Sequence, residues 1–163
     1  MRISAIVKES IVDGPGLRYV VFVQGCPHRC AGCHNPGTHD AAGGTEISAA
    51  ELAADLRQAI DDNPLLQGVT LSGGEPFLYA DELADFAERA REMGLDIWTY
   101  TGYTLRELAE PGQNKALGIA RLISLTDVLV DGRFEAAERT LEMRFVGSRN
   151  QRIIANPFAE LAG

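Results

Sequence analysis

From Arg18 onward, short apolar segments alternate with segments that have helical periodicity. The apolar segments are bounded by glycine, proline and polar turn residues, which is typical of strands in an α/β protein. Strands are expected at residues 18–24, 68–72, 95–101, 127–130 and 151–155. Strand–helix alternation predicts a parallel sheet with helical crossovers, so the expected fold class is α/β.

Helix boundaries are visible in the same region. Two helix starts carry a capping box, a hydroxyl residue followed three positions later by glutamate: Ser48 with Glu51, and Thr104 with Glu107. Another helix is expected to begin at Asp81 and to stop at Gly94. The helix that follows Thr104 is expected to break at Pro111-Gly112. These helices supply the crossovers that the expected parallel sheet requires.

Glycine-containing turns follow three of the expected strands. They are Gly73-Gly74, Thr101-Gly102 and Asp131-Gly132. Parallel sheets bind their ligands at the carboxyl ends of the strands, where such turns lie. The sequence therefore predicts a ligand site at this edge of the sheet.

The size and charge of the chain exclude several classes of function. With 163 residues, a single domain spanning residues 1–163 is expected. The formal net charge is −8, which disfavours binding to a nucleic-acid backbone. The first residues have no uninterrupted apolar core, so no signal peptide is expected, and no apolar run is long enough for a membrane span.

All three cysteines lie within eight positions, as Cys26-x3-Cys30-x2-Cys33. None is left for a distant disulfide, so a reducing cytoplasm is the expected compartment. Thiolates are the usual protein ligands of iron–sulfur clusters. Three thiolates satisfy three irons of a [4Fe–4S] cubane and leave the fourth iron open, as catalytic metal sites require. The loop therefore predicts a [4Fe–4S] site with Cys26, Cys30 and Cys33 as ligands.

The cysteine spacing alone leaves other readings open. A structural zinc site would use the three thiolates and His28, His34 or His39 as the fourth ligand. The cysteines could also be buried or redox-active without a metal. An electron-carrier ferredoxin is disfavoured, because it usually supplies four cysteines for each cluster.

A second motif, Ser72-Gly73-Gly74-Glu75-Pro76, follows an expected strand and precedes an expected helix. Its glycines let the backbone approach a ligand closely, and Glu75 can accept a charge-assisted hydrogen bond from an ammonium group. Together with the cysteine loop, this motif resembles the radical S-adenosylmethionine (SAM) superfamily. In that superfamily the run binds the methionine amino group of SAM, which strongly disfavours the zinc reading.

The resemblance is more specific than the superfamily. The first half of the chain resembles the glycyl-radical-enzyme activases in three runs: residues 13–18 (DGPGLR), 22–26 (FVQGC) and 33–36 (CHNP). The second half is similar to the anaerobic ribonucleoside-triphosphate reductase activating proteins in another three: residues 96–103 (DIWTYTGY), 128–134 (VLVDGRF) and 144–152 (RFVGSRNQR). The resemblance spans residues 11 to 152.

This resemblance implies a truncated (β/α) partial barrel that is open along one side. It also implies reductive cleavage of SAM on the [4Fe–4S] cluster to a 5′-deoxyadenosyl radical. That radical would abstract hydrogen from a glycine of the large subunit of anaerobic ribonucleotide reductase, with flavodoxin or ferredoxin as the reductant. Two alternatives stay open: an activase of another glycyl-radical enzyme, of the pyruvate formate-lyase type, and a non-enzymatic module that binds zinc or a cluster.

The same resemblance assigns SAM contacts residue by residue. The expected SAM-binding residues are Gly32, Cys33, His34, Ser72, Gly73, Gly74, Glu75 and Thr101. Many radical SAM proteins have an aromatic residue just before the third cysteine, where this chain has Gly32. The reductase activases have an aromatic residue just after that cysteine, where this chain has His34. Stacking of His34 on adenine is therefore an open point.

Several other residues have two readings each. Trp98 is expected in the core more than at a cofactor, whereas Tyr100 and Tyr103 either line the cleft or pack against the protein. Four charged residues near the ends of the last strands also have two readings. They contact SAM or the partner protein, or they are structural or ordinary surface residues: Asp131, Arg133, Arg149 and Arg152.

Overall fold

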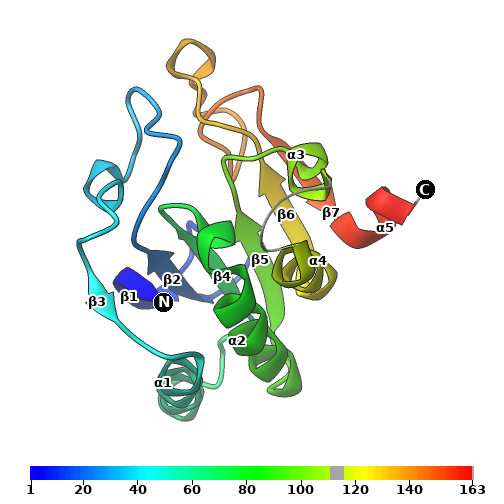
Figure 1. The fold of residues 1–163 in the computed structure, drawn as a ribbon. Helices are drawn as coiled ribbons and strands as arrows, with labels where there is room; N and C mark the ends of the chain where they lie inside the picture. Colours follow the sequence, from blue (N-terminus) through cyan, green and yellow to red (C-terminus); the bar gives the residue numbers. More distant parts are fainter. Residues whose placement is uncertain (111–115, 163) are drawn as a thin grey trace.

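The computed structural model describes residues 1–110 and 116–162, and within them it contains one mixed seven-stranded sheet and five α-helices (Figure 1). Four strands in the middle of the sheet are parallel: β2 (Arg18–Val23), β4 (Gly68–Gly73), β5 (Asp96–Tyr100) and β6 (Val128–Asp131). Antiparallel strands complete the two sides: β1 (Arg2–Ser10), β3 (Thr45–Glu46) and β7 (Arg152–Ala155). The order is β3-β1-β2-β4-β5-β6-β7, so the sheet is open and does not close on itself.

The helices are α1 (Ala49–Asp62), α2 (Ala80–Glu92), α3 (Leu105–Ala109), α4 (Ala116–Leu125) and α5 (Pro157–Ala162). Buried residues of α1 to α4 share one hydrophobic core with Tyr19, Val21, Leu71 and Ile97, which alternate along the strands. These helices therefore cover the same face of the sheet. No helix in the described part of the chain is long and apolar enough to cross a membrane.

Both capping boxes are confirmed. The Ser48 and Thr104 hydroxyls accept from the N–H groups of Glu51 and Glu107, whose carboxylates accept in return from the backbone of the capping residues. Helix α2 begins at Ala80, one residue before the predicted start, and Gly94 follows it with a φ of +86°. The predicted break at Pro111-Gly112 lies outside the described residues.

Two features of the sheet differ from the sequence-based expectation. Strands β1 and β3 were not predicted; β1 has mixed exposure and lacks the continuous apolar run of the central strands. Strand β7 was predicted, but it runs antiparallel to β6. The segment between them contains only the short 3-10 helix η3 (Ala136–Glu138). Without a helical crossover, the chain returns to the sheet from the opposite direction.

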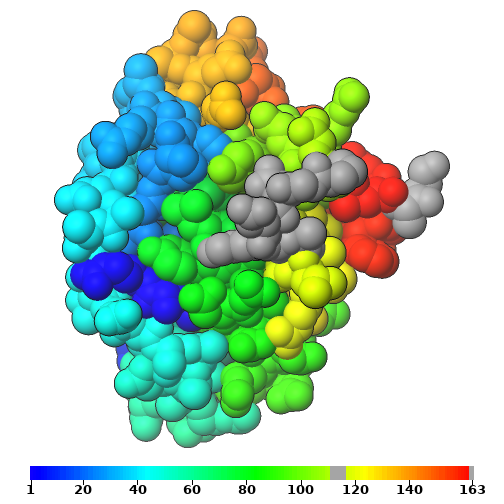
Figure 2. All heavy atoms as spheres, viewed as in Figure 1, coloured from blue at the N-terminus to red at the C-terminus, as the bar shows by residue number. Residues whose placement is uncertain are grey.

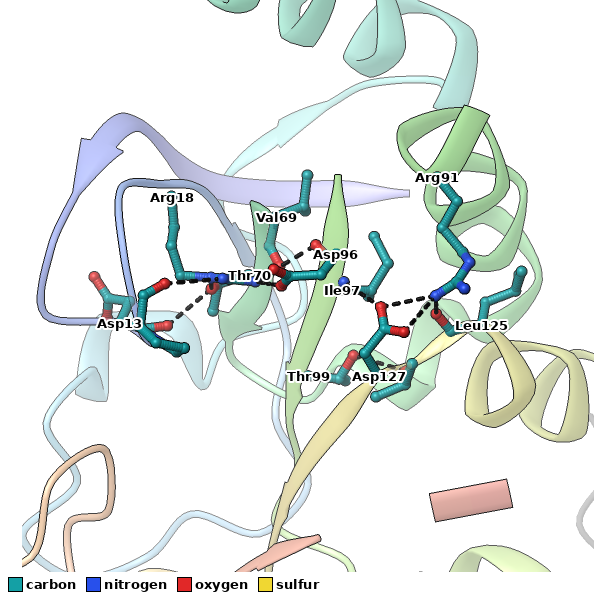
Figure 3. Close-up of polar contacts among 12 residues, drawn as sticks. Asp13, Arg18, Val69, Thr70, Arg91, Asp96, Ile97, Thr99, Leu125 and Asp127 are labelled. Carbon is teal, nitrogen blue, oxygen red and sulfur yellow. Dashed lines mark hydrogen bonds and ion pairs between the residues drawn. The ribbon is translucent and has the colours of Figure 1, made fainter. Parts of the chain in front are cut away.

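The face of the sheet away from the shared helical core carries polar and aromatic side chains. Figure 3 shows Arg18 of β2 reaching across β4 toward β5. Its guanidinium donates to Thr70 Oγ1 of β4 at 2.7 Å and to Asp96 Oδ1 of β5 at 2.5 Å. Its side chain is fully buried. Trp98 lies on the same face, with the Arg18 guanidinium 5.9 Å from its ring and Phe145 packed edge-on against it. This face of the sheet is therefore covered by side chains that pack against one another.

The loops after the parallel strands gather at one end of the sheet, at the top of Figure 1. The cysteine loop, residues 25–44, follows β2, and the segment of residues 132–151 follows β6. In Figure 2 these segments, blue and orange, form the upper end of the molecule. Contact between His34 and Phe134 joins them, with 5.1 Å between the ring centroids. The two segments therefore meet at the carboxyl ends of the parallel strands.

Candidate functional site

A cavity of about 440 Å³ lies at the carboxyl ends of the parallel strands. Its volume falls in the range of small-molecule and cofactor sites. Eight of the ten residues predicted for the site line it: Cys26, Cys30, Cys33, His34, Ser72, Gly73, Gly74 and Thr101. Gly32 and Glu75 do not line it. The fold thus brings the two sequence motifs, which are some 40 residues apart, to one cavity.

The cysteine loop presents three thiols to this cavity, and all three are partly exposed. Backbone N–H groups of His28 and Arg29 are directed at the Cys26 sulfur, and the Asn35 N–H donates to Cys33 Sγ at 3.3 Å. Burial raises the pKa of the Cys26 thiol, and the two N–H groups oppose that rise. Such N–H groups stabilise thiolates bound to iron.

The donor set suits a cubane. Among the described residues, no group of three or more His, Cys, Asp or Glu side chains is placed to hold one metal ion. A cubane takes each thiolate on a different iron, so its ligands stand farther apart than those of a single ion. The three cysteines line one cavity, as the three thiolate ligands of one cubane must.

The Gly73-Gly74 pair of the second motif lets the turn after β4 lie close to the backbone of the cysteine loop. A Cβ at Gly74 would lie 2.1 Å from the carbonyl oxygen of Gly25. That carbonyl accepts from the Glu75 N–H at 2.8 Å, so the turn after β4 is joined directly to the start of the cysteine loop. Any side chain at Gly74 would push the two motifs apart.

Glu75 is fully buried and accepts four hydrogen bonds. Its Oε1 accepts from the Phe77 N–H at 3.0 Å and from Thr101 Oγ1 at 2.9 Å. Its Oε2 accepts from the Gly102 N–H at 2.9 Å and contacts His28 Nε2 at 2.8 Å. A carboxylate has about four acceptor sites, and all of them have partners inside the protein. Direct contact with a ligand ammonium stays a prediction, and it requires one donor to give way.

His28 connects the cysteine loop to this carboxylate. Its side chain is only 5% exposed, and its ring packs edge-on against Tyr103 at 4.4 Å between centroids. Nδ1 lies 3.3 Å from Arg133 Nε, which is always a donor. The Glu75 carboxylate can only accept, so Nε2 must be the donor in that contact. In a neutral His28 ring the hydrogen therefore lies on Nε2, and Nδ1 accepts from Arg133.

Aromatic rings line the cavity near the third cysteine. His34 and Phe134 lie in tilted contact, and Phe145 and Tyr100 lie on other parts of the wall. Burial and the nearby Asp13 carboxylate raise the pKa of Tyr100 above its usual value, so its hydroxyl stays protonated. Part of the wall is therefore suited to a flat aromatic group.

The structure gives different partners to the four charged residues whose roles the sequence did not decide. Asp131 is buried, accepts from the Leu105 N–H at 2.7 Å at the start of α3, and is paired with Arg152. Arg149 is paired with Glu142 on the surface. These two pairs support the loop after β6. Arg133 alone contacts a residue of the cysteine loop, through His28.

Sequence reasoning missed the roles of His28 and Phe134. His28 was considered only as a zinc ligand, and Phe134 only as part of a family motif. The contact of His28 with Glu75 joins residues 47 positions apart, which no local pattern reveals. Gly102 was the available signal, because a Cβ there would lie 2.3 Å from the His28 ring.

Residues 12–154 match the family model described as a 4Fe-4S single cluster domain. The chain is 35% identical over 153 residues to the anaerobic ribonucleoside-triphosphate reductase-activating protein of Enterobacteria phage T4, covering 89% of this chain and 88% of the relative. It is 39% identical over 150 residues to the Vibrio cholerae protein of the same name, covering 86% and 89%.

A pyruvate formate-lyase-activating enzyme from Clostridium pasteurianum is 44% identical over 98 residues, or 58% of this chain and 40% of that enzyme. This match is higher in identity but much shorter than those to the reductase-activating proteins. The matches to the reductase-activating proteins cover nearly the whole of both chains. The chain therefore belongs to the 4Fe-4S single cluster domain family and to the anaerobic ribonucleoside-triphosphate reductase-activating proteins.

Proposed function

We propose that this protein is a radical SAM enzyme that generates a glycyl radical on the large subunit of anaerobic ribonucleotide reductase. The observation that carries the proposal is the single cavity lined by all three cysteines and by Ser72, Gly73 and Gly74. Near-full-length similarity to reductase-activating proteins supports the choice of partner. One domain, residues 1–163, performs this function as a truncated (β/α) barrel that is open along one side.

Cys26, Cys30 and Cys33 hold the [4Fe–4S] cluster and leave one iron free for SAM. Held there and reduced by an external donor, the cluster would supply the one electron that cleaves SAM to methionine and a 5′-deoxyadenosyl radical, which would take a hydrogen atom from the substrate glycine. The N–H groups directed at Cys26 and Cys33 stabilise the thiolate ligands. A flavodoxin- or ferredoxin-type protein is the electron donor.

The turn after β4 binds the methionine end of SAM. Ser72, Gly73 and Gly74 line the cavity beside the cysteines, and the absence of side chains on the glycines lets the backbone approach the ligand closely. Glu75 contributes negative charge behind this turn, where an ammonium group is stabilised. Thr101 lines the cavity and fixes Glu75 through its hydroxyl.

His34 and Phe134 form the adenine side of the site. Their rings are in contact at the cavity wall, and His34 directly follows the third cysteine. An adenine ring stacks favourably on such groups. Gly32 precedes the third cysteine with a φ of +73°, a left-handed conformation that favours glycine.

The open side of the sheet suits a protein substrate. A full (β/α) barrel usually has about 250 residues, more than this chain supplies. We infer that the glycine loop of the partner completes the wall, and that residues 147–152 take part in docking. Exclusion of water and side reactions would then depend on the bound partner.

The test mixes the protein, SAM and dithionite or reduced flavodoxin with a class III reductase from the same source. Electron paramagnetic resonance (EPR) is expected to show a glycyl doublet on the reductase, and methionine and 5′-deoxyadenosine should accumulate. The doublet should be absent when the radical-site glycine of the reductase is changed to alanine. SAM cleavage without a doublet on any glycyl-radical enzyme would contradict the assigned substrate.

A second candidate function is activation of a pyruvate formate-lyase-type enzyme. The observation that favours it is the 44% identity over 98 residues to the activating enzyme from Clostridium pasteurianum. The same EPR assay, run with a pyruvate formate-lyase in place of the reductase, decides between the two. A doublet only on the lyase would establish this second function.

A further inference from the structure

We infer that His28 is a positioning residue that locks the cysteine loop to the SAM-binding turn through Glu75. This inference rests on the proposed function, because it concerns how the cavity is kept in shape for SAM. His28 is not a cluster ligand; its ring lines the same cavity as the cysteines, and its role is to act through Glu75.

The first support is the choice of partners around Glu75. Three of its four donors, Phe77, Thr101 and Gly102, come from turns that directly follow β4 and β5. Those turns are fixed by the parallel sheet itself. His28 alone comes from the cysteine loop, so its bond at 2.8 Å is the side-chain tie between that loop and the buried carboxylate.

The second support is the space made for the imidazole. Gly102 has no side chain, and a Cβ there would come within 2.3 Å of His28 Cδ2 and 2.7 Å of Nε2. Tyr103 closes the next side of the ring, and Arg133 donates to Nδ1. Both ring nitrogens therefore have partners, and the ring is held from several directions in a buried site.

The consequence concerns the loop between Cys26 and Cys30. His28 stands midway between these two thiols, so fixing its ring restricts the backbone that carries both of them. The same bond holds Glu75 beneath the turn formed by Gly73 and Gly74. The backbone bond from Glu75 to Gly25 ties the start of the cysteine loop to the SAM-binding turn, and the His28 bond adds a side-chain tie at the middle of that loop, as outer residues do around other metal sites.

The test compares His28→Ala and His28→Gln with the wild-type holoenzyme prepared without oxygen. Alanine removes both contacts, whereas the glutamine amide can donate to Glu75 and accept from Arg133. The dissociation constant for SAM should rise about tenfold or more in His28→Ala, the loss expected for a hydrogen bond to a charged group. It should return to within about threefold of wild type in His28→Gln.

The EPR spectrum of the reduced cluster provides a readout that general stability would not move. Wild-type protein should show a spectral change when SAM is added, and His28→Ala should lose most of that change at matched iron content. The matched control is His39→Ala, in the same loop, because His39 Nε2 is buried and has no hydrogen-bond partner among the described residues. That variant should keep the wild-type affinity and spectral change.

Two double variants test whether His28 acts through the residues named. His28→Ala in a Glu75→Ala background should weaken SAM binding no further, because the partner is already absent. Gly102→Ala should weaken SAM binding by displacing His28, and it should add nothing in the His28→Ala background. An extra loss of SAM affinity in the His28→Ala background would mean that the new methyl group blocks SAM directly. It would contradict the role of Gly102 in making room for the His28 ring.

Normal SAM affinity and a normal spectral change in His28→Ala would overturn the inference, as would additive losses with Glu75→Ala. If His28→Ala takes up no iron, His28→Gln decides, because it must restore both iron and SAM affinity. A glutamine variant as impaired as the alanine variant would also overturn it. Failure of the wild-type protein to bind SAM would instead contradict the proposed function.

Discussion

Replacing Cys30 by alanine will abolish SAM cleavage and the site-differentiated cluster. Wild-type protein reconstituted without oxygen should bind close to four irons and four sulfides, the content of one cubane. The chain has only three cysteines, so Cys30→Ala leaves two thiolates and no replacement. Losing a direct ligand should cost more than the 10- to 100-fold typical of outer residues, so turnover should fall by at least about 100-fold.

Iron and sulfide analysis, together with quantification of 5′-deoxyadenosine, measures this effect. His39→Ala serves as the control, since it changes a side chain of the same loop whose Nε2 has no hydrogen-bond partner within residues 1–110 and 116–162. Tightly held zinc as the only metal in wild-type protein prepared without oxygen would refute the cluster assignment. Full iron content in Cys30→Ala would show that this thiol is not a ligand.

Replacing Arg18 by methionine will destabilise the protein far more than the same change at Arg91. The Arg18 side chain is fully buried and donates to Thr70, to Asp96 and to the Val69 carbonyl. Its loss leaves buried acceptors without a donor and should cost about 3 kcal/mol. For a chain of this size, that loss lowers the melting temperature by roughly 6–12 °C.

Arg91 provides the matched comparison in Figure 3, where it forms an ion pair with Asp127. Both side chains of that pair are substantially exposed, so the expected loss is below about 1 kcal/mol. Thermal unfolding of the two variants at matched iron content measures the difference. Equal shifts in melting temperature would show that the buried hydrogen bonds of Arg18 stabilise the protein no more than the exposed ion pair of Arg91.

Local chemistry explains which parts of the fold the sequence predicted. The capping boxes at Ser48 and Thr104 formed as expected, because each depends only on residues three positions apart. The central strands were visible because both of their faces are covered, which favours continuous apolar runs. Strand β1 was missed, since it is partly exposed along its length and its pairing with β2 is irregular.

In the candidate site too, features set by local sequence were predicted and features set by distant contacts were not. The cysteines and the glycine turn were found because their spacing and residue types are chemically distinctive. Glu75 was expected to face the ligand, yet its surroundings include a loop residue 47 positions away. The buried pairing of Asp131 with Arg152 was likewise invisible, because it depends on β7 returning beside β6. Contacts of this kind are set by topology and have no local signature.

The tie between His28 and Glu75 also constrains the order in which the protein matures. Glu75 is in place only after β4 and β5 have paired, because two of its donors follow β5. Contacts between residues so distant in sequence form late in folding, since the intervening loop must first be closed. The cysteine loop can therefore reach its final shape only on an assembled sheet. Iron delivered before β4 and β5 have paired would meet a cysteine loop that lacks its tie to Glu75.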